Sequence, residues 1–198
     1  RWLGDVYKRQ SGNGYVYAAW MEMGRDTTAD GSYYVAKILT KYSDDYGAPD
    51  SWSDVIELDT APDSSLGCCV DSVKVSISDN TVHWVWRYIN AGTYDSEIRY
   101  TSSSLGGTIA GYDVVADRSM DVTTMTGSIL WSTILDTDNS NTLVGWLEVI
   151  VDAGFIDSGT TQLIISENGD DWSGVKEVPH NTPDGGNTFH IYTPPIAT

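Results

Sequence analysis

The chain has 198 residues, a formal net charge of −17 and 40% hydrophobic residues. The acidic balance argues against a nucleic-acid partner, because such binding depends on Lys and Arg contacts with phosphates. No apolar run approaches the ~20 residues that a membrane-spanning helix needs, so we expect no membrane span. The apolar content is sufficient for a sizeable core, and the many Trp and Tyr residues favour a β-sheet protein.

Residues 1–10 resemble a translated sequencing adapter. We therefore expect this segment to be non-native and to lie outside the fold, with a genuine first strand as the alternative. A chain that begins in this way gives no information on secretion from the missing signal peptide. The interpretation also predicts that the first structural unit lacks its innermost strand.

The rest of the chain contains three copies of one pattern: a strand ending in Trp, a polar loop, a second strand, and a turn that begins with Ser. The strands end at Trp20, Trp86 and Trp146, and their spacing suits a four-stranded sheet with its loops. Repeated sheets of this length usually stack into a propeller or solenoid. The predicted fold is all-β, a β-propeller fragment of about three four-stranded antiparallel blades. We place the partial propeller domain at 11–198, with blades near 11–60, 69–117 and 121–180 and the start of another at 185–198.

The second and third units can be followed strand by strand, since alternating segments are separated by Gly, Asp, Asn and Ser. The second should have four antiparallel strands at 72–77, 81–88, 97–102 and 108–116. The third repeats this plan at 121–135, 142–151, 160–166 and 175–178. Within 82–88, Trp84, Trp86 and Tyr88 share one face while residues 83, 85 and 87 share the other. Both faces carry bulky side chains, as expected for a blade between two neighbours.

Only two cysteines occur, at the adjacent positions Cys68 and Cys69. A disulfide between neighbours requires an unusual ring, because consecutive Cα atoms lie closer together than in most bridged pairs. Small buried residues at the start of a strand are the alternative, as is a lost partner. The redox state therefore stays open, and an oxidising compartment is allowed but not required.

Two polar turns carry a recurring motif. Its first copy consists of Ser43, Asp45, Gly47 and Trp52, and its second of Ser166, Asn168, Gly169 and Trp172. Both resemble the Asp-box of sialidase-like propellers, the repeat of bacterial neuraminidases, with small insertions or deletions before the Trp. We expect the Asp or Asn side chain to cap backbone N–H groups of the turn, the Gly to adopt positive φ and the Trp to cover the hairpin. The motif therefore indicates fold and not catalysis.

The resemblance implies a secreted or cell-surface carbohydrate-active protein similar to exo-sialidases, which would hydrolyse glycosides with a glycan or glycoconjugate as partner. Such enzymes bind the substrate carboxylate with three arginines and use a Tyr nucleophile assisted by Glu, with an Asp as acid/base. The full set cannot be placed in residues 11–198. A noncatalytic glycan-binding or adhesion module is the alternative, as is a structural cell-surface repeat protein.

Candidate site residues are few. Arg87 and Arg99 flank one loop, so they are candidates for approaching a common ligand, although ion-pair arginines are commoner. Glu22, Tyr88 and Glu148 each lie two residues after a repeat Trp, where a Tyr and a Glu in one pocket would suit glycosidase chemistry. Recurrence in every unit favours a structural role for these three instead.

No cofactor is expected from the motifs. A loop containing Asp136, Asp138 and Ser140 offers alternating oxygen ligands for Ca²⁺, but it lacks the Gly and the bidentate Glu of a calcium loop. A plain polar hairpin is therefore the preferred interpretation. Exposed blade faces would also favour self-association.

Overall fold

The computed structural model describes residues 2–10, 13–28, 31–64, 70–90, 92–138, 141–167 and 171–178. In this part of the chain every regular element is a β-strand. Sheet A contains β1 (Trp2–Gln10), β2 (Val16–Thr28), β3 (Gly31–Ser43) and β4 (Ile56–Ser64). Sheet B contains β5 (Val70–Ser78), β6 (Thr81–Ile89), β7 (Ser96–Ser104) and β8 (Asp113–Arg118). Sheet C contains β9 (Met120–Asp121), β10 (Thr126–Asp138), β11 (Asn141–Asp152), β12 (Phe155–Glu167), β13 (Asp171–Trp172) and β14 (Lys176–Val178).

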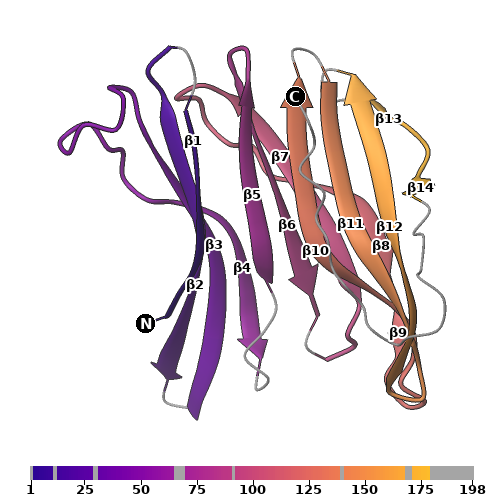
Figure 1. Cartoon of the computed structure of the whole chain (residues 1–198). Coiled ribbons are helices and arrows are strands. Elements are labelled where there is room, and N and C mark those ends of the chain that lie inside the picture. The colour runs from indigo at the N-terminus through magenta and orange to yellow at the C-terminus, as the bar shows by residue number, and fades with distance from the viewer. Residues whose placement is uncertain are drawn as a thin grey trace.

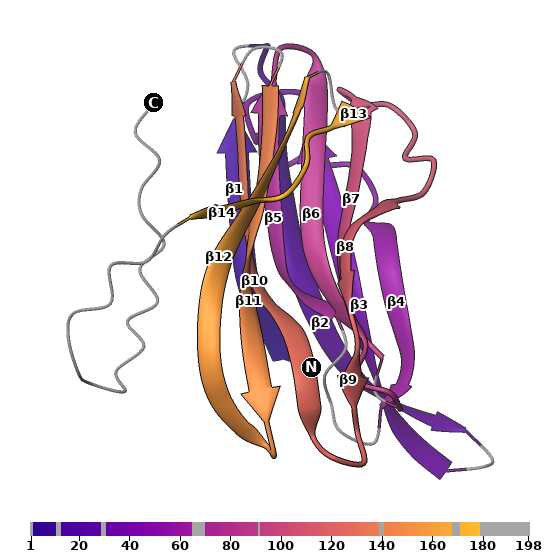
Figure 2. The same ribbon diagram turned by 90° about the vertical axis from the view of Figure 1, so that its right-hand side faces the viewer.

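Sheets A and B are antiparallel meanders in which consecutive strands pair in chain order. In sheet C the strands β10, β11 and β12 pair in chain order in the same way. β14 pairs with β12 and takes the position of the fourth strand of the meander. Figure 1 shows sheet A on the left, sheet B in the middle and sheet C on the right. Figure 2, seen from the side of sheet C, shows β10, β11 and β12 in front of β5 and β6. Successive four-stranded meanders stacked in this way are the blades of a β-propeller, and the all-β prediction is confirmed.

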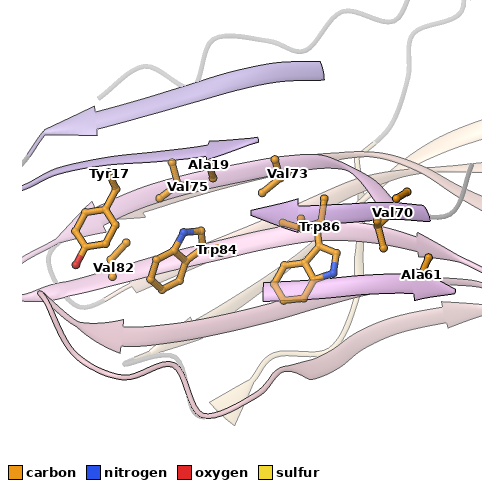
Figure 3. Packing of buried hydrophobic residues seen from close by; sticks show 11 residues of the cluster. Tyr17, Ala19, Ala61, Val70, Val73, Val75, Val82, Trp84 and Trp86 are labelled. Carbon is orange, nitrogen blue, oxygen red and sulfur yellow. The ribbon is translucent and has the colours of Figure 1, made fainter. Parts of the chain in front are cut away.

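The first core lies between sheets A and B. Trp84 and Trp86 of β6 are almost completely buried there, against Tyr17 of β2 and the inner face of β5 (Figure 3). Their spacing of two residues puts both indoles on one face of the strand, as the alternation predicted. Each large apolar side chain buried in this way contributes roughly 1.5–3 kcal/mol.

The second core lies between sheets B and C. Val85 of β6 is fully buried on the opposite face from Trp84, in a cluster with Tyr100, Leu130 and Trp146. Sheet B therefore has both faces covered, which confirms the expectation drawn from residues 82–88.

The tryptophans of the repeat pattern differ in their polar partners. Trp86 Nε1 donates a hydrogen bond of 2.6 Å to Asp59 Oδ2 in sheet A. Trp146 Nε1 is buried and has no hydrogen-bond partner within the described part of the chain. Asp59 pairs with Ile38 on β3, and Ala116 occupies the corresponding register in sheet B, opposite Ile98. The second junction therefore has an alanine where the first has a carboxylate.

Residues 2–10 do not lie outside the fold in the structure, contrary to the sequence-based expectation. They form β1, which pairs with β2 from Gln10↔Val16 to Trp2↔Met23. The connection between the two strands includes Gly14, whose φ of 85° favours glycine. Antiparallel pairing uses backbone groups that every non-proline residue has, so this segment completes sheet A whatever the origin of its sequence. Sheet A therefore has the innermost strand that the sequence analysis expected to be missing.

The first polar turn is held by the hydroxyl of Ser43. Its Oγ accepts hydrogen bonds from the backbone N–H groups of Asp45 (3.2 Å) and Gly47 (2.9 Å). Gly47 has a φ of 82°, as predicted, and Trp52 forms an isolated β-bridge with Ser43. The capping acceptor thus differs from the expected Asp45 carboxylate: Ser43 is buried at the end of β3, whereas Asp45 is exposed to solvent.

The second polar turn is closed by the same kinds of contacts as the first. Trp172 pairs with Ser166 in the β12–β13 ladder, as Trp52 pairs with Ser43. In addition, Ser173 exchanges two hydrogen bonds with the backbone of Ile165, and residues 53 and 42 make the same pair of bonds. A Trp-Ser dipeptide therefore closes both polar turns. Asn168 and Gly169 lie outside the described residues.

Several sequence-based predictions lie outside the described residues. These are the cysteines at 68 and 69, Ser140 and the expected further unit at 185–198. Within the described ranges, no helix is long and apolar enough to cross a membrane.

Candidate functional site

The first long strand of each sheet is irregular. The pairing register shifts between Leu3 and Val6 on β1, between Asp71 and Lys74 on β5, and between Trp131 and Thr133 on β10. β5 contacts both β1 and β10, so these strands are neighbours (Figure 1). β-Bulges bend a strand and redirect its side chains, and they are frequent next to binding sites. This edge of the three sheets is therefore the first place to look for a site.

Two bulges contain a serine with left-handed backbone. Ser72 has a φ of 54° and Ser132 a φ of 42°, in a region that non-glycine residues seldom adopt. The Thr133 hydroxyl donates to the Ser72 carbonyl, and the Leu130 N–H donates to the Ser96 hydroxyl at 2.9 Å. These two bonds join sheets B and C at the bulges, which fixes the backbone there.

Asp71 and Arg87 form an ion pair beside the β5 bulge. They face each other in the β5–β6 register, and the guanidinium donates through Nε to Oδ1 (2.7 Å) and through Nη2 to Oδ2. Arg87 Nη1 also donates to the Leu130 carbonyl of β10 at 3.3 Å. The Arg87 side chain is 9% exposed and that of Asp71 is 33% exposed. The arginine is thus buried and neutralised, while its carboxylate partner reaches solvent.

Trp131 lies next to this ion pair on β10. The Arg87 guanidinium carbon is 5.2 Å from the centroid of the indole ring, which is cation–π geometry. Trp131 is nonetheless 44% exposed. The exposed indole thus contacts a buried arginine that also binds a carboxylate, on a strand whose backbone is fixed.

Arg99 does not join Arg87, because the two side chains lie on opposite faces of sheet B. Arg99 pairs in register with Trp86, and Arg87 pairs with Ile98. One residue of offset is enough to reverse the face in a strand. The expectation that these arginines approach a common ligand is therefore not met by the structure.

Arg99 instead joins sheet B to sheet A. Its Nη1 donates to Asp59 Oδ2 at 2.7 Å and its Nε to Glu97 Oε2 at 2.7 Å. Its guanidinium carbon lies 3.6 Å from the ring centroid of Tyr88 and 4.3 Å from that of Tyr112. Burial acts to lower the pKa of Arg99, but the hydrogen bonds to the two carboxylates outweigh it and raise that pKa. The Arg99 side chain therefore stays charged and is bound by the carboxylates of Asp59 and Glu97.

The residues that follow the repeat tryptophans make contacts at separate junctions. Tyr88 packs against Arg99 between sheets A and B. Glu148 of β11 accepts two hydrogen bonds from Arg118 of β8, at 2.6 and 2.9 Å, between sheets B and C. The hydrogen bond to Glu148 raises the pKa of Arg118. Glu22 takes the corresponding position on β2 in sheet A. The contacts of Tyr88 and Glu148 are those of a structural role, not of one shared pocket.

The segment considered as a weak calcium candidate lies in a strand ladder as far as the structure describes it. The β10–β11 ladder extends to the pair Asp138↔Asn141, and Asp136 pairs with Leu143 inside it. Asp136 and Asp138 therefore belong to a strand and not to a ligand-bearing loop. Among the described residues, no group of three or more His, Cys, Asp and Glu side chains is placed to hold a metal ion.

A buried histidine lies between sheets B and C. His83 Nδ1 is 2.7 Å from the Tyr100 hydroxyl and its Nε2 is 3.2 Å from Ser78 Oγ. Burial lowers the pKa of His83 to about 4, so the imidazole is neutral at pH 7. It stabilises the interface as an uncharged polar group.

Sequence reasoning did not single out Asp71 or Trp131. Asp71 was not detectable from the turn at 78–81, because regular pairing would put it opposite Tyr88 and only the bulge between Asp71 and Lys74 brings it opposite Arg87. The exposure of Trp131 was not detectable either, since it depends on a bulge that the residue pattern does not reveal.

Comparisons with known proteins assign no family. No family model matches the chain, and no curated protein matches it. One solved structure to which it is similar is the Penicillium chrysogenum alpha-L-arabinanase complexed with arabinobiose, with 16% identity and a TM-score of 0.48. The match covers 89% of this chain and 50% of that chain, so the chain spans about half the length of that protein. At this level the likeness carries no argument about activity, and the fold class rests on the sheets themselves.

Proposed function

We propose that this chain is a glycan-binding unit of a carbohydrate-active β-propeller and that Trp131 is its binding surface. The observation that carries the proposal is the exposed indole on a bulged strand, which contacts Arg87, the same arginine that forms an ion pair with the Asp71 carboxylate. Aromatic rings offer sugars a flat apolar face, and a carboxylate accepts hydrogen bonds from hydroxyl groups. The two together are the elements of a polar-ligand site.

The test is a glycan array followed by titration calorimetry with whichever glycans bind. The variant Trp131→Ala should lose binding, whereas Phe155→Ala should bind like the unaltered chain. Phe155 is a matched control, because it is 78% exposed and lies at the tip of the β11–β12 hairpin. Equal binding by the Trp131→Ala variant would count against the proposal, as would an array on which nothing binds.

Glycoside hydrolysis is the second candidate, and the observation that favours it is the partly exposed carboxylate of Asp71, the ion-pair partner of Arg87. Glycosidases require a pair of carboxyl groups flanking the scissile bond, so a second group would have to join Asp71. Arg87, Arg99 and Arg118 each pair with a carboxylate, which gives sialoside hydrolysis no support from these three side chains. A panel of fluorogenic glycosides, sialosides included, separates the two candidates: release of fluorophore that Asp71→Asn abolishes would establish hydrolysis.

A further inference from the structure

We infer that the Trp131 site selects uncharged glycans against glycans that carry carboxylates, and that the Asp71–Arg87 pair sets this preference. The inference rests on the proposed function and adds the class of ligand. It concerns the charge of the glycan next to the indole and not the identity of the sugar.

The guanidinium of Arg87, which lies next to the indole, already donates its hydrogen bonds to protein acceptors. Recognition of a carboxylate by arginine requires two parallel N–H groups that point at the ligand. Arg87 directs Nε and Nη2 to Asp71, and Nη1 to the Leu130 carbonyl. With a side chain that is 9% exposed, the guanidinium is oriented toward protein acceptors and away from solvent.

In the Asp71–Arg87 pair the carboxylate is the partner that solvent reaches. One-third of the Asp71 side chain is exposed, and the whole chain carries a formal net charge of −17. A ligand carboxylate near the indole would therefore be repelled both locally and at longer range. A neutral sugar is not repelled, and its hydroxyl groups can donate to the lone pairs of Asp71 that Arg87 leaves available.

The β10 bulge takes one residue beside the indole out of the ladder. The ladder passes from Trp131 to Thr133, so Ser132 lies out of register with β11. Its φ of 42° turns the backbone next to the indole. A residue outside the ladder pairing can present its N–H or C=O group to a ligand hydroxyl group, which both donates and accepts hydrogen bonds. This is a second reason to expect a polyhydroxyl ligand without charge.

The test uses the full chain and two pairs of probes in which every carboxylate of the acid is replaced by its methyl ester. One pair is sialyllactose and its methyl ester, and the other is trigalacturonic acid and its methyl ester, both added to the glycan array. In each pair of probes that binds, we expect the ester to bind roughly tenfold tighter than the acid, which corresponds to about 1.4 kcal/mol. Raising the salt concentration should narrow this ratio, because screening weakens the repulsion.

Two variants locate the preference. Asp71→Asn should bring the affinities of the ester and the acid together within about threefold, because it removes the negative charge and frees a guanidinium edge. Glu97→Gln is the control, since it removes one carboxylate from an ion pair on the opposite face of sheet B. That variant should leave the ratio unchanged. The salt titration needs no variant, so the inference stays testable even where Asp71→Asn fails to fold.

The outcomes separate the two claims. Trp131-dependent binding in which the acids equal or exceed their esters overturns the inference and leaves the proposed function standing. A ratio that persists in Asp71→Asn also overturns it. Absence of any Trp131-dependent glycan binding removes the proposed function, and the inference with it.

Discussion

Lowering the pH should destabilise the chain through His83. The imidazole lies between sheets B and C, is 4% exposed, and contacts the hydroxyl groups of Tyr100, Ser78 and Thr142. No charged group is among these contacts. Burial of the ring lowers its pKa from 6.5 to about 4 in the folded chain.

The sign follows from proton binding. Between pH 6.5 and about 4 the unfolded chain holds a proton on this histidine and the folded chain does not, so the free energy of unfolding falls as the pH falls. A pKa lowered from 6.5 to about 4 corresponds to roughly 3 kcal/mol when both states are protonated. At pH 5 the loss is roughly 2 kcal/mol, because part of the titration is then complete.

The assay is urea unfolding followed by Trp fluorescence at pH 7, 6, 5 and 4.5. The variant His83→Asn keeps a polar side chain but does not titrate. Carboxylates such as Glu57, whose pKa is lowered by its hydrogen bond from Lys37, titrate alike in the unaltered chain and in the His83→Asn variant. The difference between the two chains therefore isolates the histidine. Parallel curves across this pH range would refute the reasoning.

Three further substitutions test the fold. Ser43→Ala should cost about 1 kcal/mol in urea unfolding through loss of two backbone caps, whereas Asp45→Ala should change the free energy by less than about 0.5 kcal/mol; the reverse order would restore the sequence-based assignment of the cap. Asp59→Asn should cost roughly 3 kcal/mol, because it removes the charge from a buried ion pair; a loss below about 1 kcal/mol would show that the pair is not buried in solution. Gly127→Ala should lower the thermal midpoint strongly, since φ is 148° and the new Cβ would lie 2.7 Å from a backbone oxygen. Gly24→Ala is its control, with no atom within 4 Å of the added carbon, and equal midpoints for the two variants would contradict the geometry.

The stacking of sheets could be predicted because side-chain alternation alone places residues on faces. Trp84 and Trp86 had to share a face, and Val85 had to oppose them. Bulky side chains on both faces then required a neighbour on each side, as the two cores show. No knowledge of turns or register was needed for this step.

The candidate site could not be predicted, because it depends on register. Whether Arg87 and Arg99 meet is decided by one residue of offset between β6 and β7, and the sequence does not specify that offset. The exposure of Trp131 depends in the same way on a one-residue irregularity in β10. The strand at 2–10 escaped prediction for another reason: resemblance to an adapter sequence does not prevent backbone pairing.

The unequal surroundings of Trp86 and Trp146 bear on how similar repeats avoid exchanging partners. A sheet that offers Asp59 to an indole N–H and an arginine is matched to the sheet that carries both, and a sheet with Ala116 at that register is not. Placing sheet C against sheet A would leave the Asp59 carboxylate without its guanidinium, which is costly for a buried charge. The contacts of Asp59, which are made at the first junction and have no counterpart at Ala116, therefore distinguish the neighbours of sheet B from each other.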